Sequence, residues 1–280
     1  MFKILKREEL NPTVTSLVVD APLIAKKAQP GQFVIVRVHE DGERIPLTIA
    51  DFNREAGTVT IIFQIVGRTT KLLNNLQVGD SILDFVGPLG KPSEIEGFKH
   101  VCVIGGGVGC AIAYPTAKGL HENGTKVTTI TGFRNKDLVI LEDDFKNVSD
   151  NYYLVSDDGS AGKKGLVTNQ LEELLQAGEV FDEVIAIGPL IMMKFVCATT
   201  AKYNLKTTVS MNPIMIDGTG MCGCCRLSVG GEMKFACVDG PDFDGHLVDF
   251  DEAMARSRQY SDFEARERER DCNLFHKEVA

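Results

Sequence analysis

The chain has no excess of basic residues, no long apolar run and no low-complexity tract. Its 30 Lys and Arg are outnumbered by 39 Asp and Glu, and the formal net charge is −9. A surface that binds nucleic acid needs clustered basic side chains, so a nucleic-acid partner is not expected. No apolar stretch approaches the ~18 residues of a membrane span, and residues 1–7 are charged too early for a signal peptide. We therefore expect a cytoplasmic globular protein without a membrane span, long enough for two domains.

Four of the eight cysteines gather between residues 222 and 237, which argues against a disulfide framework. Asp217, Cys222, Cys225 and Cys237 follow the pattern D-x4-C-x2-C-x11-C. This is the C-x4-C-x2-C…C spacing of plant-type 2Fe-2S proteins with aspartate in place of the first cysteine. The spacing predicts a 2Fe-2S centre with these four residues as its ligands.

Two alternatives to this ligand set stay open. A structural zinc site also accepts thiolates and a carboxylate, but such sites are usually built from two separated Cys-x2-Cys arms, and here only one arm has that form. Cys224 adjoins Cys225 and competes with it as a ligand. The glycines at 218, 220 and 223 favour a cluster, because a loop that wraps a cluster brings its backbone amides close to the sulfides.

The pattern of apolar residues changes near residue 98 and predicts four segments. Before it, short runs rich in β-branched residues at 13–19, 33–38, 58–66 and 81–85 are typical of an antiparallel barrel or sandwich. After it, apolar strands alternate with helical patterns, which predicts a parallel sheet with crossover helices. The fold class is therefore β + α/β. We place the boundaries at 1–98 for the β domain, 99–208 for the α/β domain, 209–250 for the cysteine region and 251–280 for a helical tail.

A glycine-rich turn opens the expected α/β domain. The strand predicted at 100–104 leads into Gly105, Gly106, Gly107, Val108 and Gly109, and a helix is predicted from 111. Without Cβ atoms the backbone of such a turn can approach a pyrophosphate, and the following helix N-terminus favours its charge. A strict G-x-G-x-x-G would need glycine at residue 110, where Cys110 stands, so a tight structural turn is the competing interpretation.

Three further segments fall at the carboxyl ends of predicted strands, where ligands bind in open α/β sheets. They contribute Arg134, the pair Asp157 and Asp158, and the pair Gly188 and Pro189.

In the β domain, residues 44–48 are a candidate ligand-binding segment. Arg44 and Thr48 place a cation and a hydroxyl four residues apart, suited to a phosphate and a ring heteroatom; the alternative is an ordinary amphipathic strand. Segments 66–70 and 87–90 are predicted as loops that supply backbone and hydroxyl groups near a second phosphate, or else as plain hairpin connections. The candidate residues in these three segments are Arg44, Pro46, Leu47, Thr48, Thr69, Thr70 and Gly87.

Together these motifs resemble the ferredoxin–NADP reductase superfamily along nearly the whole chain. Residues 44–48 (RIPLT) look like its R-x-[YF]-[ST] flavin motif, 87–90 (GPLG) like its G-P-L-G turn, and 105–109 (GGGVG) like its G-G-G-x-G nucleotide loop. The segments 212–226 and 235–241 resemble the branch in which the cluster follows the nucleotide domain. That branch holds the electron-transfer subunit of dihydroorotate dehydrogenase and the small subunit of NADH-dependent reduced ferredoxin:NADP oxidoreductase, and Asp217 makes the second the better match.

The resemblance implies a role for each motif. Arg44 would contact the FAD pyrophosphate, Thr48 would hydrogen-bond the isoalloxazine as the catalytic contact, and Thr69 or Thr70 would assist the phosphates. The turn at 105–109 would carry the NAD pyrophosphate. Asp157 or Asp158 would bind the ribose and favour NADH, whereas Arg134 would instead favour a 2′-phosphate.

The chain departs from the family pattern at two positions. Ile187 stands where relatives often carry cysteine, and Pro46 stands where many have an aromatic residue. The chain therefore has no thiol at residue 187, and stacking on the flavin must come from elsewhere.

The resemblance implies a function in electron transfer. The chain would oxidise NADH at FAD and pass single electrons through a 2Fe-2S cluster to a larger flavin and iron–sulfur subunit, as a heterodimer in an electron-bifurcating NADH/ferredoxin/NADP complex. The alternatives are an electron-transfer subunit of dihydroorotate dehydrogenase and a non-redox nucleotide-binding module with structural zinc.

Overall fold

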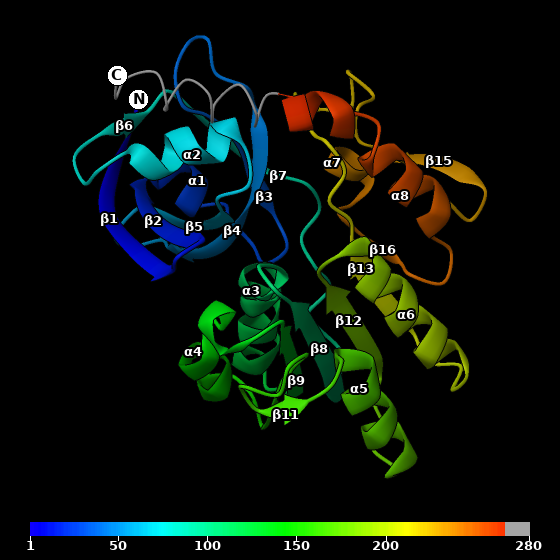
Figure 1. Cartoon of the computed structure of the whole chain (residues 1–280). Helices are drawn as coiled ribbons and strands as arrows, with labels where there is room; N and C mark the ends of the chain where they lie inside the picture. Colours follow the sequence, from blue (N-terminus) through cyan, green and yellow to red (C-terminus); the bar gives the residue numbers. More distant parts are fainter. Residues whose placement is uncertain (267–280) are drawn as a thin grey trace, which may run out of the picture.

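The computed structural model describes residues 1–266. Two seven-stranded sheets and one two-stranded hairpin make up its β-structure in that range. In Figure 1 the first sheet is blue to cyan, the second sheet with its helices is green, and the cysteine region is yellow to orange beside both.

The first sheet is an antiparallel barrel, as the sequence predicts. Its strand order is β6-β1-β2-β5-β4-β3-β7. The two edge strands are separated by one residue in the chain, so the edges of the sheet meet and the sheet curls closed. Alternating burial along β5, with Val59, Ile61 and Phe63 inward, shows one face packed on a core. The strands are β1 Phe2–Asn11, β2 Val14–Asp20, β3 Phe33–Arg37, β4 Ile45–Asn53, β5 Thr58–Gln64, β6 Ser81–Ile82 and β7 Asp84–Leu89.

Two segments predicted as loops are regular structure instead. Besides the short helix α1 (Pro22–Ala25), the barrel carries α2 (Arg68–Asn75), which begins inside the segment 66–70. The Thr70 hydroxyl stabilises that start, because it accepts hydrogen bonds from the amides of Val66 and Gly67 at 2.9 and 3.0 Å. Residues 87–89 belong to β7, since they lie alongside β3, where Leu89 pairs with Phe33. Long-range pairing thus overrides the local turn signal of Gly-Pro.

The second sheet is parallel except at one edge. Its order is β11-β10-β9-β8-β12-β13-β16, and only β16 runs antiparallel to its neighbour within the described chain. Its central strands are buried on both faces, as continuous apolar runs predict. The strands are β8 His100–Gly106, β9 Lys126–Phe133, β10 Asn151–Ser156, β11 Lys163–Lys164, β12 Glu183–Ile187, β13 Thr207–Ser210 and β16 Asp242–Asp244.

Helices cover both faces of this sheet. Alternate residues of β8 point to opposite sides: Val101 and Val103 pack with α3 and α4, whereas Cys102 and Ile104 pack with α5 and α6. This is the α/β arrangement expected from the alternation of strands and helices. The helices are α3 Gly109–Glu122, the 3₁₀ helix η1 Lys136–Leu138, α4 Glu142–Asn147, α5 Val167–Gln176 and α6 Leu190–Ala201.

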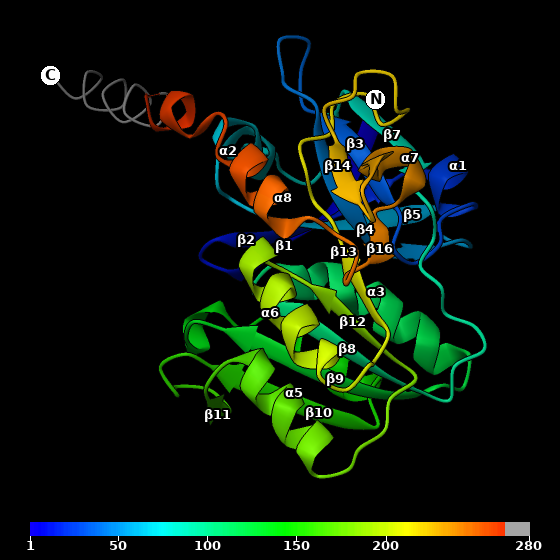
Figure 2. The ribbon, with the colours of Figure 1, turned by 90° about the vertical axis from the view of Figure 1, so that its right-hand side faces the viewer.

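The cysteine region is a small unit attached to both sheets. It contains the hairpin of β14 (Arg226–Val229) and β15 (Glu232–Phe235), the short helix α7 (Ala236–Asp239) and the edge strand β16. Helix α8 (Phe250–Ser257) follows and lies beside α6 (Figure 2). Helical backbone returns at 261–266, and the remainder of the tail expected at 251–280 lies outside the described residues.

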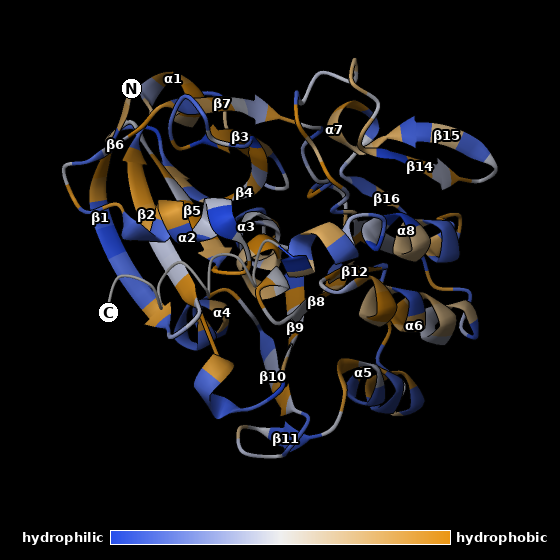
Figure 3. Ribbon diagram, turned by 45° about the horizontal axis from the view of Figure 1, so that its top comes forward, coloured by the Kyte–Doolittle hydropathy of each residue, from blue (hydrophilic) through white to orange (hydrophobic). Residues whose placement is uncertain are grey.

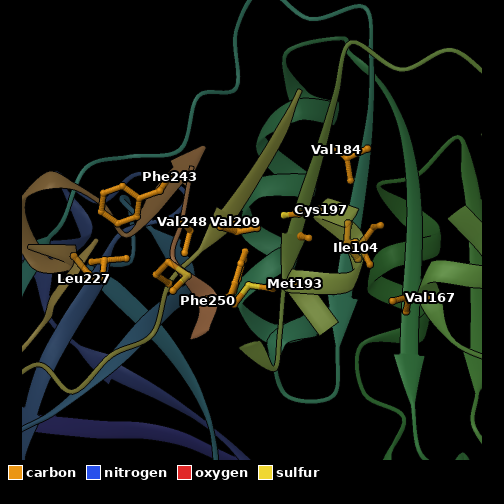
Figure 4. Close-up of a cluster of buried hydrophobic side chains, with 14 of the residues drawn as sticks. Ile104, Val167, Val184, Met193, Cys197, Val209, Leu227, Phe243, Val248 and Phe250 are labelled. Carbon is orange, nitrogen blue, oxygen red and sulfur yellow. The ribbon is translucent and has the colours of Figure 1, made fainter. Parts of the chain in front are cut away.

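One apolar core connects the cysteine region to the second sheet and to barrel strand β3. Figure 4 shows the row of side chains that forms it, from Leu227 and Phe243 of the cysteine region to Val209, Ile104 and Val184 of the second sheet. Figure 3 shows that apolar colouring is concentrated in the central strands, whereas the outlying β11 is hydrophilic. Among the residues described, none of the helices is both long and apolar enough to cross a membrane.

Truncating this shared core should destabilise the protein. Leu227 is 2% exposed, so Leu227→Ala should lower the free energy of unfolding by about 2–5 kcal/mol, because it removes buried methyl groups and leaves a cavity. Met233 on the partner strand is 63% exposed, so Met233→Ala should change it by less than about 0.5 kcal/mol. Urea unfolding followed by circular dichroism measures both. An equal effect of the two substitutions would contradict the shared core.

Candidate functional site

The expected flavin motif lies at the start of β4. Pro46 pairs with Ile35 and Thr48 with Phe33 on β3, and residues 44–48 are all half-buried. Arg44 is fixed from two sides. Its Nε donates a 2.7 Å hydrogen bond to the carbonyl of Ile216, and its Nη1 lies 3.5 Å from Asp84 Oδ2. The arginine thus reaches the loop that carries Asp217, a contact that the sequence did not predict.

The neighbouring candidates have distinct local roles. Thr70 caps α2 with its hydroxyl, whereas the Thr69 hydroxyl donates to Glu43 Oε2 at 3.0 Å. Both hydroxyls are therefore buried and bonded within the protein, so the start of α2 offers a phosphate its backbone amides alone. Gly87 lies in β7 against Val34.

The glycine-rich turn has the geometry expected for a nucleotide. It joins the end of β8 to the start of α3 at Gly109, so the first amides of that helix face the carboxyl edge of the sheet. Gly107 has φ of +56°, a left-handed conformation that favours glycine, and its amide donates to the carbonyl of Gly132 at 2.8 Å. That hydrogen bond ties the turn to β9, so the loop is also a tight structural connection.

The other three predicted strand ends lie at the same edge. In the sheet register Gly105 pairs with Ile187 and with Thr131, and Phe133 pairs with Ser156. Because these strands are parallel, the residues that follow them emerge side by side. The structure thereby brings to one edge Arg134, Asp157, Asp158, Gly188 and Pro189.

Asp158 forms hydrogen bonds within the loop that follows β10. Its Oδ1 accepts hydrogen bonds from the amide and the hydroxyl of Ser160 at 2.8 and 2.6 Å. The Ser160 side chain, followed by its amide, lowers the pKa of Asp158, and the carboxylate is fully exposed. The edge therefore carries a fixed negative charge at neutral pH.

Two of the predicted cluster ligands are in contact. Cys225 Sγ lies 3.3 Å from Cys237 Sγ, and both side chains are buried. Two thiolates on one tetrahedral ion lie about 3.8 Å apart, given metal–sulfur bonds of ~2.3 Å. The observed separation is shorter than this, but it brings the two thiols close enough for both to bind the same iron. Burial raises the pKa of Cys237 to about 12, so a bound ion would have to displace its proton.

The other two predicted ligands lie on the exposed part of the loop. Asp217 accepts hydrogen bonds from the amides of Thr219 and Cys222, each at 2.7 Å, and these amides lower the pKa of its carboxyl. Cys222 is exposed. Cys224 is half-exposed, and its Sγ is 3.9 Å from the carbonyl of Cys222.

The loop provides one of the two ligand pairs that a 2Fe-2S cluster needs. Within residues 1–266, no three His, Cys, Asp or Glu side chains converge on a site for one ion. Four ligands of a 2Fe-2S cluster divide into two pairs, and the contact of Cys225 with Cys237 supplies one pair. Left-handed backbone at Gly218, Gly220 and Gly223 forms the tight loop that the sequence predicts around the cluster.

Sequence reasoning missed Asp84. This carboxylate accepts from Arg37 Nε at 2.6 Å and also faces Arg44, so it holds the guanidinium of Arg44 beside the cysteine loop. A lone aspartate at a strand start carries no sequence signal for this role.

Comparison with known families agrees with this picture of the cysteine loop. Residues 212–249 match the model of the iron-sulfur cluster binding domain of dihydroorotate dehydrogenase B. This range contains all four predicted ligands, and the match favours a cluster over structural zinc.

The fold has close counterparts among solved structures. A chain of the NADH-dependent reduced ferredoxin-NADP oxidoreductase, studied for flavin-based electron bifurcation, is 47% identical and covers 96% of this chain and 97% of its own, with a TM-score of 0.91. The cytochrome P450 reductase GcoB of Amycolatopsis is 19% identical, covers 72% of this chain and 65% of its own, and has a TM-score of 0.61, so it shares the fold alone.

Curated relatives match along nearly the whole length. A homologue of the dihydroorotate dehydrogenase B (NAD(+)) electron transfer subunit from Thermotoga maritima is 49% identical over 94% of this chain and 92% of its own. The dihydroorotate dehydrogenase B (NAD(+)) electron transfer subunit of Shouchella clausii is 34% identical over 86% of this chain and 94% of its own. The chain belongs to the family of dihydroorotate dehydrogenase B electron transfer subunits and their homologues.

Proposed function

We propose that this protein is the NAD(H)-oxidising electron-transfer subunit of an electron-bifurcating NADH/ferredoxin/NADP oxidoreductase. The observation that carries the proposal is the end-to-end match, at 47% identity and a TM-score of 0.91, to a chain of the NADH-dependent reduced ferredoxin-NADP oxidoreductase. In this proposal the β domain at 1–98 binds FAD, the domain at 99–208 binds NAD(H), and the region at 209–250 binds a 2Fe-2S cluster.

The sheet edge supports the assignment to NAD(H). The start of α3 offers backbone amides to a pyrophosphate, and Gly188 and Pro189 lie against the turn that precedes it. Asp157 and Asp158 lie at the same edge, two strands away from the turn, where they would face the adenosine ribose. The protein needs no acid–base pair for hydride exchange, since its task is to orient two rings and exclude water.

The β4 segment supports the assignment to FAD. Arg44 offers a cation to phosphate and Thr48 offers a hydroxyl to the ring, and β4 packs directly against α3 of the nucleotide domain. FAD, when bound, supplies the conversion between two-electron exchange with NADH and one-electron exchange with the cluster. Cys225 and Cys237 hold one side of that cluster in the apolar core, and Asp217 and Cys222 hold the exposed side.

A larger catalytic subunit that carries flavin and iron–sulfur centres completes the function as a heterodimer, in the cytoplasm. The exposed side of the cysteine loop is the route by which electrons leave this chain. Purifying the native complex and identifying its second subunit tests this assignment directly.

The second candidate is an electron-transfer subunit of dihydroorotate dehydrogenase, which the relatives named for that enzyme favour. The dihydroorotate branch, however, usually has cysteine at the first ligand position, and this chain has Asp217 there. A second subunit that oxidises dihydroorotate and reduces the cluster of this chain would establish this candidate instead.

The cluster ligands can be tested by single substitutions. Cys222→Ala should lose the cluster, because it removes one of four ligands, whereas Cys224→Ala should keep about two irons per chain. Asp217→Cys should also keep a 2Fe-2S cluster but change its reduction potential, since a thiolate is a softer donor than a carboxylate. Iron and sulfide analysis with electron paramagnetic resonance measures these outcomes. About four irons per chain, or zinc, would show the assignment to be wrong.

The flavin motif can be tested by comparing substitutions at the start of β4 with a control substitution just after its end. Arg44→Ala should weaken FAD binding by about 10- to 100-fold, because it removes a charge-assisted contact to phosphate. Thr48→Ala should retain FAD but slow flavin reduction by NADH. Arg54→Ala, beyond the far end of β4, should do neither. Equilibrium titration with FAD and stopped-flow absorbance measure the effects. Unchanged FAD affinity and reduction rate in both motif variants would exclude the proposed roles.

Nucleotide preference depends on the carboxylates at the sheet edge. We expect kcat/KM for flavin reduction to be at least tenfold higher with NADH than with NADPH, because a 2′-phosphate would face like charge. Since the pKa of Asp158 lies below its ordinary value, the preference should persist from pH 8 to pH 5. Asp157→Ala and Asp158→Ala should each reduce it. Faster reduction by NADPH in the unsubstituted chain would mean that Arg134 sets the preference.

A further inference from the structure

Arg44 lies in the expected flavin motif, but its shortest hydrogen bond in the structure goes to the cysteine loop. Its Nε donates to the carbonyl of Ile216 at 2.7 Å, across 172 positions of sequence. Ile216 immediately precedes Asp217, the first predicted cluster ligand. The guanidinium therefore fixes the peptide group through which the chain enters the ligand loop.

The guanidinium is itself held in place. Asp84 Oδ2 lies 3.5 Å from Arg44 Nη1 and accepts a 2.6 Å hydrogen bond from Arg37 Nε. The three side chains are between 26% and 31% exposed, so solvent screens their charges only in part. Because a guanidinium has five N–H donors, Arg44 can hold Ile216 and Asp84 and still donate to a phosphate.

The loop beyond Ile216 is tightly connected to that anchor. Asp217 uses both carboxylate oxygens to accept the amides of Thr219 and Cys222. Gly218, with φ of +79°, approaches the barrel so closely that a Cβ would lie 2.6 Å from Leu89 Cδ1. The start of the ligand loop thus packs against barrel strand β7, and Arg44 adds a charged hydrogen bond to the same part of the loop.

We propose that Arg44 is a positioning residue for the 2Fe-2S cluster and couples it to the flavin site. This proposal rests on the proposed function, in which the cysteine loop binds the cluster. Arg44 orders the peptide before Asp217 and brings a positive charge to the ligand loop, where it stabilises the reduced cluster. Because the same side chain serves the FAD phosphate, FAD binding makes the cluster harder to release, and the cluster in turn strengthens FAD binding.

The test compares Arg44→Gln with Arg37→Gln in the full, cluster-loaded chain. Both variants remove one positive charge beside Asp84, but only the first loses the hydrogen bond to Ile216. Release of iron to an excess of chelator is followed by absorbance, with and without saturating FAD. We expect at least tenfold faster release from Arg44→Gln, no protection of that variant by FAD, and behaviour close to the unsubstituted chain for Arg37→Gln.

Two further measurements separate this role from a general loss of structure. Arg44→Lys keeps the charge but has no Nε–H in the guanidinium position, so iron release should be fast while the reduction potential stays nearer to that of the unsubstituted chain than in Arg44→Gln. The far-ultraviolet circular dichroism of all variants should be unchanged. In Arg44→Gln the midpoint potential of the cluster should be lower, as read from its reduced paramagnetic signal during titration.

The outcomes distinguish this inference from the proposed function. Equal iron release from the Arg44 and Arg37 variants, or undiminished protection of Arg44→Gln by FAD, would overturn the role of Arg44 alone. An unsubstituted chain that holds no iron–sulfur cluster would overturn the proposed function and this inference together.

Discussion

The burial of Cys225 and Cys237 in an apolar core is the constraint on which the rest of the structure depends. Their core continues through Phe243 to the parallel sheet and includes Phe33 of the barrel. Because close-packed cores allow little movement, the cysteine region is held at a fixed position between the two sheets. A redox centre bound by these thiols would therefore lie in a rigid apolar environment, next to the exposed loop that carries Cys222.

The same packing joins the barrel, the parallel sheet and the cysteine region into one structure. Strand β16, from the cysteine region, extends the parallel sheet by pairing with β13, and helix α8 packs beside α6. The barrel meets the nucleotide sheet through β4 and α3. As a result the strand that carries Arg44 and Thr48, the glycine-rich turn and the cysteine loop converge around one junction.

Asp217 shows how one substitution within a family motif is accommodated. The carboxylate of Asp217 accepts two amides of its own loop, which keep it ionised and oriented. The motif therefore has an anionic side chain where plant-type proteins have a thiolate, and its own hydrogen bonds set the tight path of the loop. Glycine at 218 allows this path to lie directly against Leu89 of the barrel.

Local patterns in the sequence determined the antiparallel barrel, the parallel sheet, the glycine-rich turn and the cysteine spacing, since alternation, apolar runs and motif spacing are properties of neighbouring residues. Tertiary structure alone decided that α2 begins at Arg68, that β7 extends to Leu89 and that β16 joins the second sheet. It also decided that Arg44 bonds to Ile216. These features depend on pairing and packing between segments far apart in the chain, and such contacts leave no periodic signal in either segment.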